Sequence, residues 1–243
     1  METADARVAA ANEEDKRHLD LRSLALTELP AGTTAVTSLE RLSLDGNALT
    51  ALPDKLTALK GLTALAASSN ALVDFPPVAM RIPTLRRLHL AGNRIASAPP
   101  DAVTGPAAAS LTALYLSGNV LDAFPDALLS CTALTTLFID GNPIRALPNN
   151  INKLANLRAL NASDCGLEAV PATLATLFEL DTLWLADNAL DALPPELASL
   201  TQLTFLDLAR NRIASLDSSA LAPLAGLEHL SLAGNALPSL EGF

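Results

Sequence analysis

Three histidines and several repeated aspartates are the side chains of this 243-residue chain that could support catalysis or metal binding. His18, His89 and His229 lie too far apart along the chain's repeat pattern for two of them to share one metal, because Zn–N bonds are about 2 Å long. Asp164 and Asp187 are spaced for neighbouring turns, like the paired carboxylates of retaining glycosidases. A repeating sequence produces such neighbours by periodicity alone. The sequence also lacks phosphate-loop, nucleophile-elbow and zinc-protease motifs, so we expect no catalytic, metal-binding or cofactor-binding residues.

The aromatic residues suggest a different kind of site. The single Trp and the single Tyr fall at one outward-facing position of a predicted strand, where variable residues alternate with aliphatic ones. Exposed aromatics grouped on a polar surface are common anchors of protein interfaces. On six successive repeats that position holds His89, Tyr115, Phe138, Asn161, Trp184 and Asp207, and Asp140, Asp187 and Phe205 flank it. We predict that these nine residues bind a partner.

Charge is divided along the same predicted face. Its earlier repeats carry Arg22, Arg41 and Arg87 beside Asp20 and Asp45, and its later repeats carry Asp140, Asp164, Asp187 and Asp207 against Arg210. Arginine stacks on aromatic rings and pairs with carboxylates. The later repeats therefore predict a protein partner with a basic or arginine-rich contact surface.

A repeated block positions these residues. The block Leu39-x-x-Leu42-x-Leu44-x-x-Asn47-x-Leu49-x-x-Leu52-Pro53 recurs with its asparagine at positions 47, 70, 93, 119, 142, 188, 211 and 235, and Cys165 replaces the missing asparagine. The steps are 23 residues, except for 26 after Asn93 and 24 after Asn211. With a degenerate first copy there are ten repeats. Asparagine or cysteine at this place is the signature of leucine-rich repeats.

The spacing within one repeat predicts its shape. Alternation at Leu42-Ser43-Leu44 indicates a short strand, and Leu56, Leu59 and Leu62 at intervals of three favour a 3₁₀ or irregular helical return. We predict an α/β fold: a curved, right-handed solenoid with a parallel sheet on its concave face and helical segments on its convex face. The asparagines should form a ladder that satisfies buried backbone groups, with a weaker rung at Cys165. The insertion at residues 104–110 should bulge on the convex side.

Residues 17–243 are predicted to form one domain, because a single repeat cannot bury its apolar face alone. Residues 1–16 should cap its first repeat, with Thr3 as the N-cap of a short helix and Asp5 in its first turn. For the other end three alternatives stay open: Phe243 folds back over the last repeat, the chain is a fragment, or the edge meets a partner.

Composition narrows the class of partner. A net charge of −10 argues against nucleic acid as a partner, and no apolar run approaches the roughly 18 residues that a membrane helix needs. Cys131 and Cys165 both occupy core positions on opposite sides of the coil, so no disulfide is expected. Without a secretory signal, these features predict a cytoplasmic protein without membrane insertion, and we expect a monomer.

The 23-residue repeat with Leu-Pro after the asparagine, as at residues 47–53, resembles intracellular leucine-rich-repeat proteins of the Ras-suppressor and Scribble-like type. Plant intracellular Ras-group-related proteins look similar. That resemblance implies a non-enzymatic scaffold that binds a signalling protein on its concave face. The alternative is a recognition or autoinhibitory segment of a larger multidomain enzyme or receptor.

Overall fold

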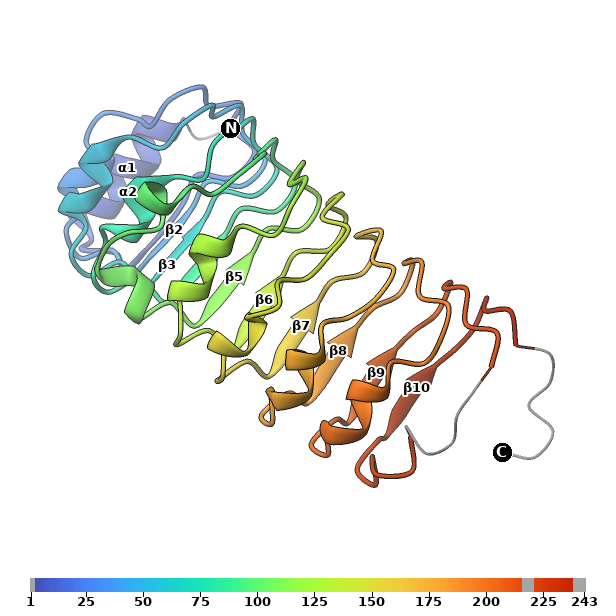
Figure 1. The fold of residues 1–243 in the computed structure, drawn as a ribbon. Coiled ribbons are helices and arrows are strands. Elements are labelled where there is room, and N and C mark those ends of the chain that lie inside the picture. The colour runs from blue at the N-terminus through green and yellow to red at the C-terminus, as the bar shows by residue number, and fades with distance from the viewer. Residues whose placement is uncertain (1–2, 216–220, 238–243) are drawn as a thin grey trace. The chain divides into compact units, whose positions relative to one another are not determined.

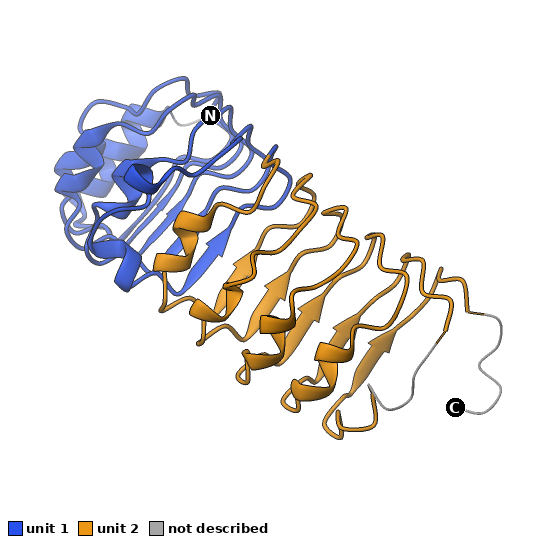
Figure 2. Cartoon of the chain, in the orientation of Figure 1, with its two compact units in different colours: residues 1–120 blue, residues 121–243 orange. Residues whose placement is uncertain are grey.

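A computed structural model describes residues 3–215 and 221–237 of the chain. The chain divides into two compact units, residues 1–120 and residues 121–243 (Figure 2). Both units consist of short parallel strands that alternate along the chain with helical segments, most of them 3₁₀ helices, labelled η.

Unit 1 begins with a helix and then follows the repeat pattern (Figure 1). Its elements are α1 (Ala4–Glu13), β1 (His18–Asp20), η1 (Thr33–Ala35), β2 (Arg41–Ser43), η2 (Asp54–Ala58), β3 (Ala64–Ala66), α2 (Pro77–Met80), β4 (Arg87–His89), η3 (Pro100–Ala102), η4 (Pro106–Ala109) and β5 (Ala113–Tyr115). Strands β1 to β5 pair in chain order, and every pair is parallel. The helical segments pack on one another, as α2 does on η2, η3 and η4.

Unit 2 continues the same alternation. Its elements are η5 (Asp126–Ser130), β6 (Thr136–Phe138), η6 (Ile151–Lys153), β7 (Ala159–Asn161), η7 (Ala172–Thr176), β8 (Thr182–Trp184), η8 (Pro195–Ser199), β9 (Phe205–Asp207) and β10 (His229–Ser231). The printed pairs, β6 with β7, β7 with β8, β8 with β9 and β9 with β10, are all parallel. Because equivalent residues pair, one core position and two outward positions repeat on every strand.

The core consists of the leucines that the repeat pattern predicts to face inward. The middle residue of each strand from β1 to β9 is a leucine with at most 2% of its surface exposed, and Leu137 is fully buried as predicted. Phe75 and Phe124 replace core leucines and are buried, whereas Phe178 is 62% exposed. Leu230 of β10 differs from the other strand leucines, because 38% of its surface is exposed.

The predicted asparagine ladder is present. The Asn47 amide nitrogen donates to the carbonyl oxygens of Leu21 at 2.9 Å and Leu44 at 2.7 Å, and its oxygen accepts from the N–H groups of Leu24 and Leu26 at 3.0 Å. Bonds of the same kinds recur at Asn70, Asn93, Asn119, Asn188, Asn211 and Asn235. One side chain thus satisfies backbone groups of two adjacent turns.

The Cys165 rung is weaker, as predicted. Its sulfur lies 3.4 Å from the carbonyl oxygens of both Ile139 and Ser163, but a thiol has only one proton to donate. An asparagine at position 165 would accept a hydrogen bond from the N–H of Ile144. That N–H donates instead to the backbone carbonyl of Asn142 at 2.8 Å. The backbone of the preceding turn therefore satisfies this donor without a side chain from the next turn.

The residue before each ladder position adopts a left-handed backbone conformation. Five of these residues are glycines, and the others are Ser23, Ser69, Asp164, Asp187 and Arg210, with φ between 51° and 57°. Left-handed backbone is uncommon for residues with a side chain. Unit 2 therefore places three charged side chains, Asp164, Asp187 and Arg210, at a turn position where glycine is usual.

The N-terminal helix has the cap that the sequence predicts. The Thr3 hydroxyl accepts a hydrogen bond from the N–H of Ala6 at 3.2 Å, and Asp5 lies in the first turn. Val8 and Ala11 are buried, and α1 packs on the edge strand β1. An open sheet edge exposes apolar side chains, so this contact shields the core of unit 1.

The insertion at residues 104–110 is partly packed rather than a simple surface bulge. It contains η4, and Ala107 within it is fully buried. Gly105 has a φ of 143°, and a Cβ atom there would clash with the carbonyl oxygen of Met80. The insertion thus folds back against α2, and this close approach requires glycine.

The alternatives for Phe243 fall outside the described residues. Among the residues that the structure describes, no helix has the length and hydrophobicity needed to cross a membrane.

Candidate functional site

In unit 2 five of the predicted site residues lie on two parallel rows of the sheet face, whereas Asp140 and Asp187 lie beyond the ends of their strands. The first row runs through Phe138, Asn161, Trp184 and Asp207, and the second row runs from Thr182 through Phe205 to His229. These side chains alternate with the buried leucines, so they stand on the side of the sheet that faces away from the core.

Four rings form a continuous series on this face, which we call the aromatic chain: Phe138, Trp184, Phe205 and His229. The centroids of Phe138 and Trp184 lie 5.4 Å apart in an edge-to-face arrangement. Trp184 lies 5.3 Å from Phe205, and Phe205 stacks on His229 at 4.4 Å. These separations are within the 4.5–7 Å range of favourable aromatic pairs, or just below it.

The first of these contacts requires the rings to lean toward each other. Phe138 and Trp184 are two strands apart, which places their backbones roughly 9.6 Å apart. The ring between them is absent because β7 carries Asn161, whose side-chain oxygen accepts from the N–H of Ser163 at 3.1 Å. This local bond turns the Asn161 amide toward its own loop, and the two rings close the gap.

His229 is the member that sequence analysis did not assign to the site. Its signal was available, because His229 pairs with Phe205 in the register of β9 and β10 and faces outward. The side chain is exposed, and it extends the apolar surface beyond Phe205.

Some of the acidic residues around the aromatic chain already accept hydrogen bonds from other groups of the protein. Asp187 receives two hydrogen bonds from the Arg210 guanidinium, both at 2.5 Å, and this contact lowers the pKa of Asp187. One oxygen of Asp207 accepts from the N–H of Ala209 at 2.9 Å. Asp140 lies two residues after the end of β6 and is half-buried. The negative charge beside the rings is therefore smaller than the sequence implies, because Arg210 neutralises Asp187.

The remaining two predicted residues belong to unit 1. His89 of β4 and Tyr115 of β5 stack with centroids 4.2 Å apart and planes 10° apart. Burial lowers the pKa of His89, an effect that nearby Asp45 opposes and Arg87 reinforces. His89 is thus a largely neutral ring at neutral pH, suited to stacking rather than to ion pairing.

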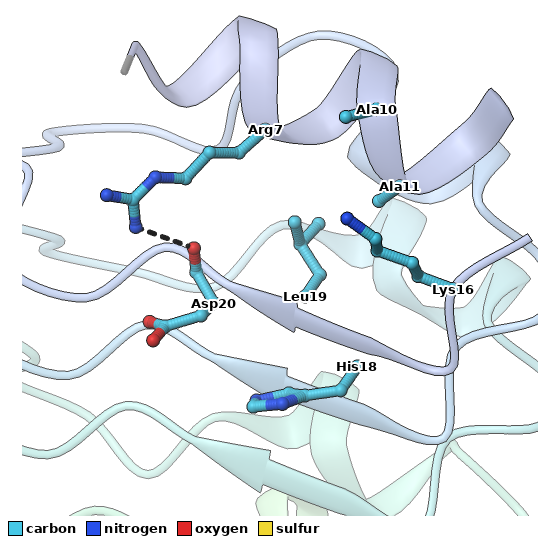
Figure 3. A pocket seen from close by; sticks show the side chains of 7 residues that line it. All are labelled: Arg7, Ala10, Ala11, Lys16, His18, Leu19 and Asp20. Atoms are coloured by element: carbon cyan, nitrogen blue, oxygen red, sulfur yellow. Dashed lines mark hydrogen bonds between the residues drawn. The ribbon is translucent and has the colours of Figure 1, made fainter. Parts of the chain in front are cut away.

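A separate hollow of about 240 Å³ lies between α1 and β1 (Figure 3). Arg7 reaches across it and donates to the carbonyl oxygen of Asp20 at 3.0 Å, and Lys16 pairs with Glu14 at 2.9 Å. The Asp20 carboxylate is held by Arg22, whose hydrogen bond lowers the pKa of Asp20 to about 2. Arg7, Lys16 and the Asp20 carboxylate thus each make at least one bond within the protein.

Metal-binding and thiol chemistry can be assessed for the cysteines, histidines and acidic residues within residues 3–215 and 221–237. No cluster of three or more histidine, cysteine or acidic residues there could hold a metal ion. Cys131 and Cys165 are free, buried thiols, and burial raises the pKa of Cys131 to about 11 and that of Cys165 to about 12. Neither cysteine has the thiolate character that a nucleophile needs.

Solved structures with the same fold come from bacteria and a plant. A leucine-rich-repeat protein of Leptospira interrogans superposes with a TM-score of 0.84 at 28% identity, covering 92% of this chain and 56% of that one. The functional domain of InlJ from Listeria monocytogenes gives 0.78 at 24% identity, covering 99% and 52%. The ectodomain of the membrane receptor kinase GASSHO1 from Arabidopsis thaliana gives 0.63 at 25% identity, covering 87% and 29%.

The chain thus spans about half of the two bacterial structures and less than a third of the plant ectodomain. A search of curated proteins gives no match. The family model described as "Leucine rich repeat" matches residues 83–144 and 178–237, half of the sequence. The phase of the ladder, the parallel strands and this match agree, and the chain belongs to the leucine-rich-repeat family.

Proposed function

We propose that this protein is a non-catalytic binding module that holds a partner protein on its sheet face. The observation that supports this most strongly is the aromatic chain of unit 2, because four rings, each in contact with the next, stand on the solvent side of a sheet. Apolar surface of this kind is typical of interaction sites, and tryptophan is among the commonest hot-spot residues.

The chemistry beside the rings favours a basic partner. A partner arginine can stack on Trp184 while its guanidinium donates to Asp207 on the next strand. Asp187 offers less, because a partner cation there must displace Arg210. We therefore propose an arginine-bearing segment, with Phe138 and Trp184 contributing most of the affinity.

The rest of the predicted surface completes the proposal. It comprises His89 and Tyr115 in unit 1 and Asn161, Asp140, Asp187, Phe205 and Asp207 in unit 2. We propose that residues 17–243 act as one domain, that the partner binds its concave face and that residues 1–16 form its cap. A cytoplasmic monomer that serves signalling, without nucleic acid or membrane insertion, fits the acidic composition and the free cysteines.

Affinity capture from a native lysate tests the proposal. Wild type is compared with the Trp184→Ala/Phe138→Ala double variant, and captured proteins are quantified by mass spectrometry. We expect specific proteins to be lost from the double variant, because each hot-spot truncation costs about 2 kcal/mol or more of binding free energy. The thermal midpoint should change little, because neither side chain is part of the core.

The matched control is Phe178→Ala, which removes an exposed ring from the opposite side of the repeat. This variant should capture the same proteins as wild type. A fluorescein-labelled hexa-arginine peptide provides a defined probe, because the anisotropy of its label reports binding to wild type, to the double variant and to Phe178→Ala alike. Equal capture by the double variant and wild type would show that the aromatic chain is not the binding surface.

A second candidate role is the recognition or autoinhibitory segment of a larger enzyme or receptor. The observation that favours it is the greater length of all three similar structures. An immunoblot of native extract separates the two roles, because a band well above 25.2 kDa supports the second one.

A further inference from the structure

We propose that unit 1 carries a separate site for a carboxylate side chain of an acidic protein segment, in a hollow over β3. The hollow has a volume of about 500 Å³ and is lined from β1 to β5. Its chemistry is opposite to that of the aromatic chain. The proposal therefore does not depend on the function assigned to unit 2.

The floor of the hollow is made by two alanines. Ala64 and Ala66 are the outward residues of β3, and both are half-buried. In the sheet register Ala64 lies between Arg41 of β2 and Arg87 of β4. Two methyl groups flanked by longer side chains leave a depression in an otherwise continuous sheet surface.

The two arginines that flank the floor have no ion-pair partner within the described residues. Five of the other arginines are paired with carboxylates: Arg17 with Glu40, Arg22 with Asp20, Arg81 with Asp54, Arg158 with Glu179 and Arg210 with Asp187. Arg41 and Arg87 are two strands, roughly 9.6 Å, apart at their backbones. Their guanidinium groups can therefore reach one carboxylate from opposite sides.

Nearby acidic groups compensate this charge only in part. The Asp20 carboxylate is engaged by Arg22. Asp45 lies beyond the end of β2, and one of its oxygens accepts from the N–H of Ser68 at 2.7 Å. The protein as a whole carries a net charge of −10, so it repels anions at long range. Binding of an acidic segment must therefore depend on local groups such as Arg41 and Arg87.

A carboxylate suits the hollow better than a phosphate does. Phosphate sites typically use a cradle of backbone N–H groups, whereas β2, β3 and β4 are hydrogen-bonded to one another. The hollow offers side-chain forks, an alanine floor and the ring of His89, which stacks on Tyr115. An extended segment with a Glu or Asp side chain directed at Ala64 matches that arrangement.

The first test measures binding of fluorescein-labelled hexaglutamate by fluorescence anisotropy. The Arg41→Gln/Arg87→Gln double variant should bind about tenfold more weakly than wild type, or worse, because two charge-assisted contacts are lost. The control Arg17→Gln/Arg81→Gln changes net charge equally but removes arginines that are already paired. It should stay within about twofold of wild type. Equal losses in both variants, or no binding by wild type, would overturn the site.

Competition distinguishes the source of the anion. Glutarate should displace the labelled peptide more effectively than inorganic phosphate at equal concentration and ionic strength. A stronger effect of phosphate would show that the carboxylate assignment is wrong. The Trp184→Ala/Phe138→Ala variant should bind hexaglutamate like wild type, so failure of this site and failure of the aromatic chain give different results.

The second test places a carboxylate in the hollow from within the chain. Ala64→Glu should raise the thermal midpoint above that of Ala64→Gln by about 1–3 °C at low salt. The difference should vanish in the Arg41→Gln/Arg87→Gln background and hexaglutamate binding should be lost in Ala64→Glu. Equal midpoints for Ala64→Glu and Ala64→Gln would contradict the convergence of the two arginines.

Discussion

At the scale of single residues, the strand leucines show how completely the repeat determines burial. Leu137 is fully buried, because it takes the inward position between Thr136 and Phe138. Leu137→Ala should lower the free energy of unfolding by about 2–5 kcal/mol, since a cavity replaces the side chain. Urea denaturation measures the loss. An unchanged midpoint would mean that the assigned register is wrong, and Thr136→Ala is the control at a neighbouring outward position.

The ladder asparagines are the polar counterpart of these leucines. Asn142 accepts from the N–H of Leu121 at 3.1 Å and donates to the carbonyl of Ile139 at 2.8 Å. Asn142→Leu should destabilise the fold by about 1–3 kcal/mol for each backbone group that is left buried and unsatisfied.

Cys165→Asn is the reverse test of the ladder. It should be stabilising, but by less than the loss in Asn142→Leu, because the Ile144 N–H already has an acceptor in the carbonyl of Asn142. Denaturation midpoints of both variants check the ladder. Two silent substitutions would show that its hydrogen bonds contribute nothing to stability.

His89 gives the stability a pH dependence. Its folded-state pKa is lowered mainly by burial, so on acidification the unfolded chain binds a proton before the folded protein does. The stabilising contribution of neutral His89 is complete above its unfolded pKa of about 6.5 and decreases as the pH falls toward the lowered folded value.

Urea midpoints at about pH 7.5 and about pH 5.5 measure this effect. His89→Gln should lose less stability over that interval than wild type loses. His18→Gln, at an exposed position, is the control. If the wild type and His89→Gln midpoints decline in parallel, His89 is not the group responsible.

At the scale of elements, the insertion at residues 104–110 depends on one glycine. The φ of Gly105 and its close approach to the Met80 carbonyl both disfavour a side chain. Gly105→Ala should therefore lower the free energy of unfolding by at least roughly 1 kcal/mol, the cost of an unfavourable backbone conformation, and the thermal midpoint should fall with it. Gly61→Ala is a less demanding control, because Gly61 has no positive φ. Equal midpoints for the two variants would show that the insertion adapts freely.

The packing of the same insertion could not be predicted from the sequence. The 26-residue step revealed that extra residues were present and that they fell in a return segment. Whether they protrude or pack depends on space beside α2, which no local pattern encodes. The structure buries Ala107 there.

At the scale of the whole molecule, we expect a monomer of 25.2 kDa in sedimentation velocity. A net charge of −10 disfavours self-association through mutual repulsion. Concentration-dependent dimers that disappear in Trp184→Ala would identify the aromatic chain as a self-association surface. Dimers that persist in Trp184→Ala would place the contact elsewhere. They would contradict the predicted monomer but not the proposed role of the aromatic chain.

The sequence by itself determined the leucine-rich-repeat class, the inward leucines, the asparagine ladder and the outward position of Trp184 and Phe138. All of these follow from the period, because a fixed step returns each residue type to the same backbone position in every turn. The more specific likeness to Ras-suppressor-type proteins stays a prediction. The similar solved structures include bacterial proteins and a receptor ectodomain.

Only the tertiary structure decided which side chains touch. It showed that Arg22 and Asp187 are neutralised by neighbours, that Arg41 and Arg87 lack ion pairs within residues 3–215 and 221–237, and that His229 extends the aromatic chain. Periodicity assigns a side chain to a face and a row. Its direction within that row depends on rotamers, on gaps left by small neighbours such as Ala64, and on contacts between strands 23 or more residues apart.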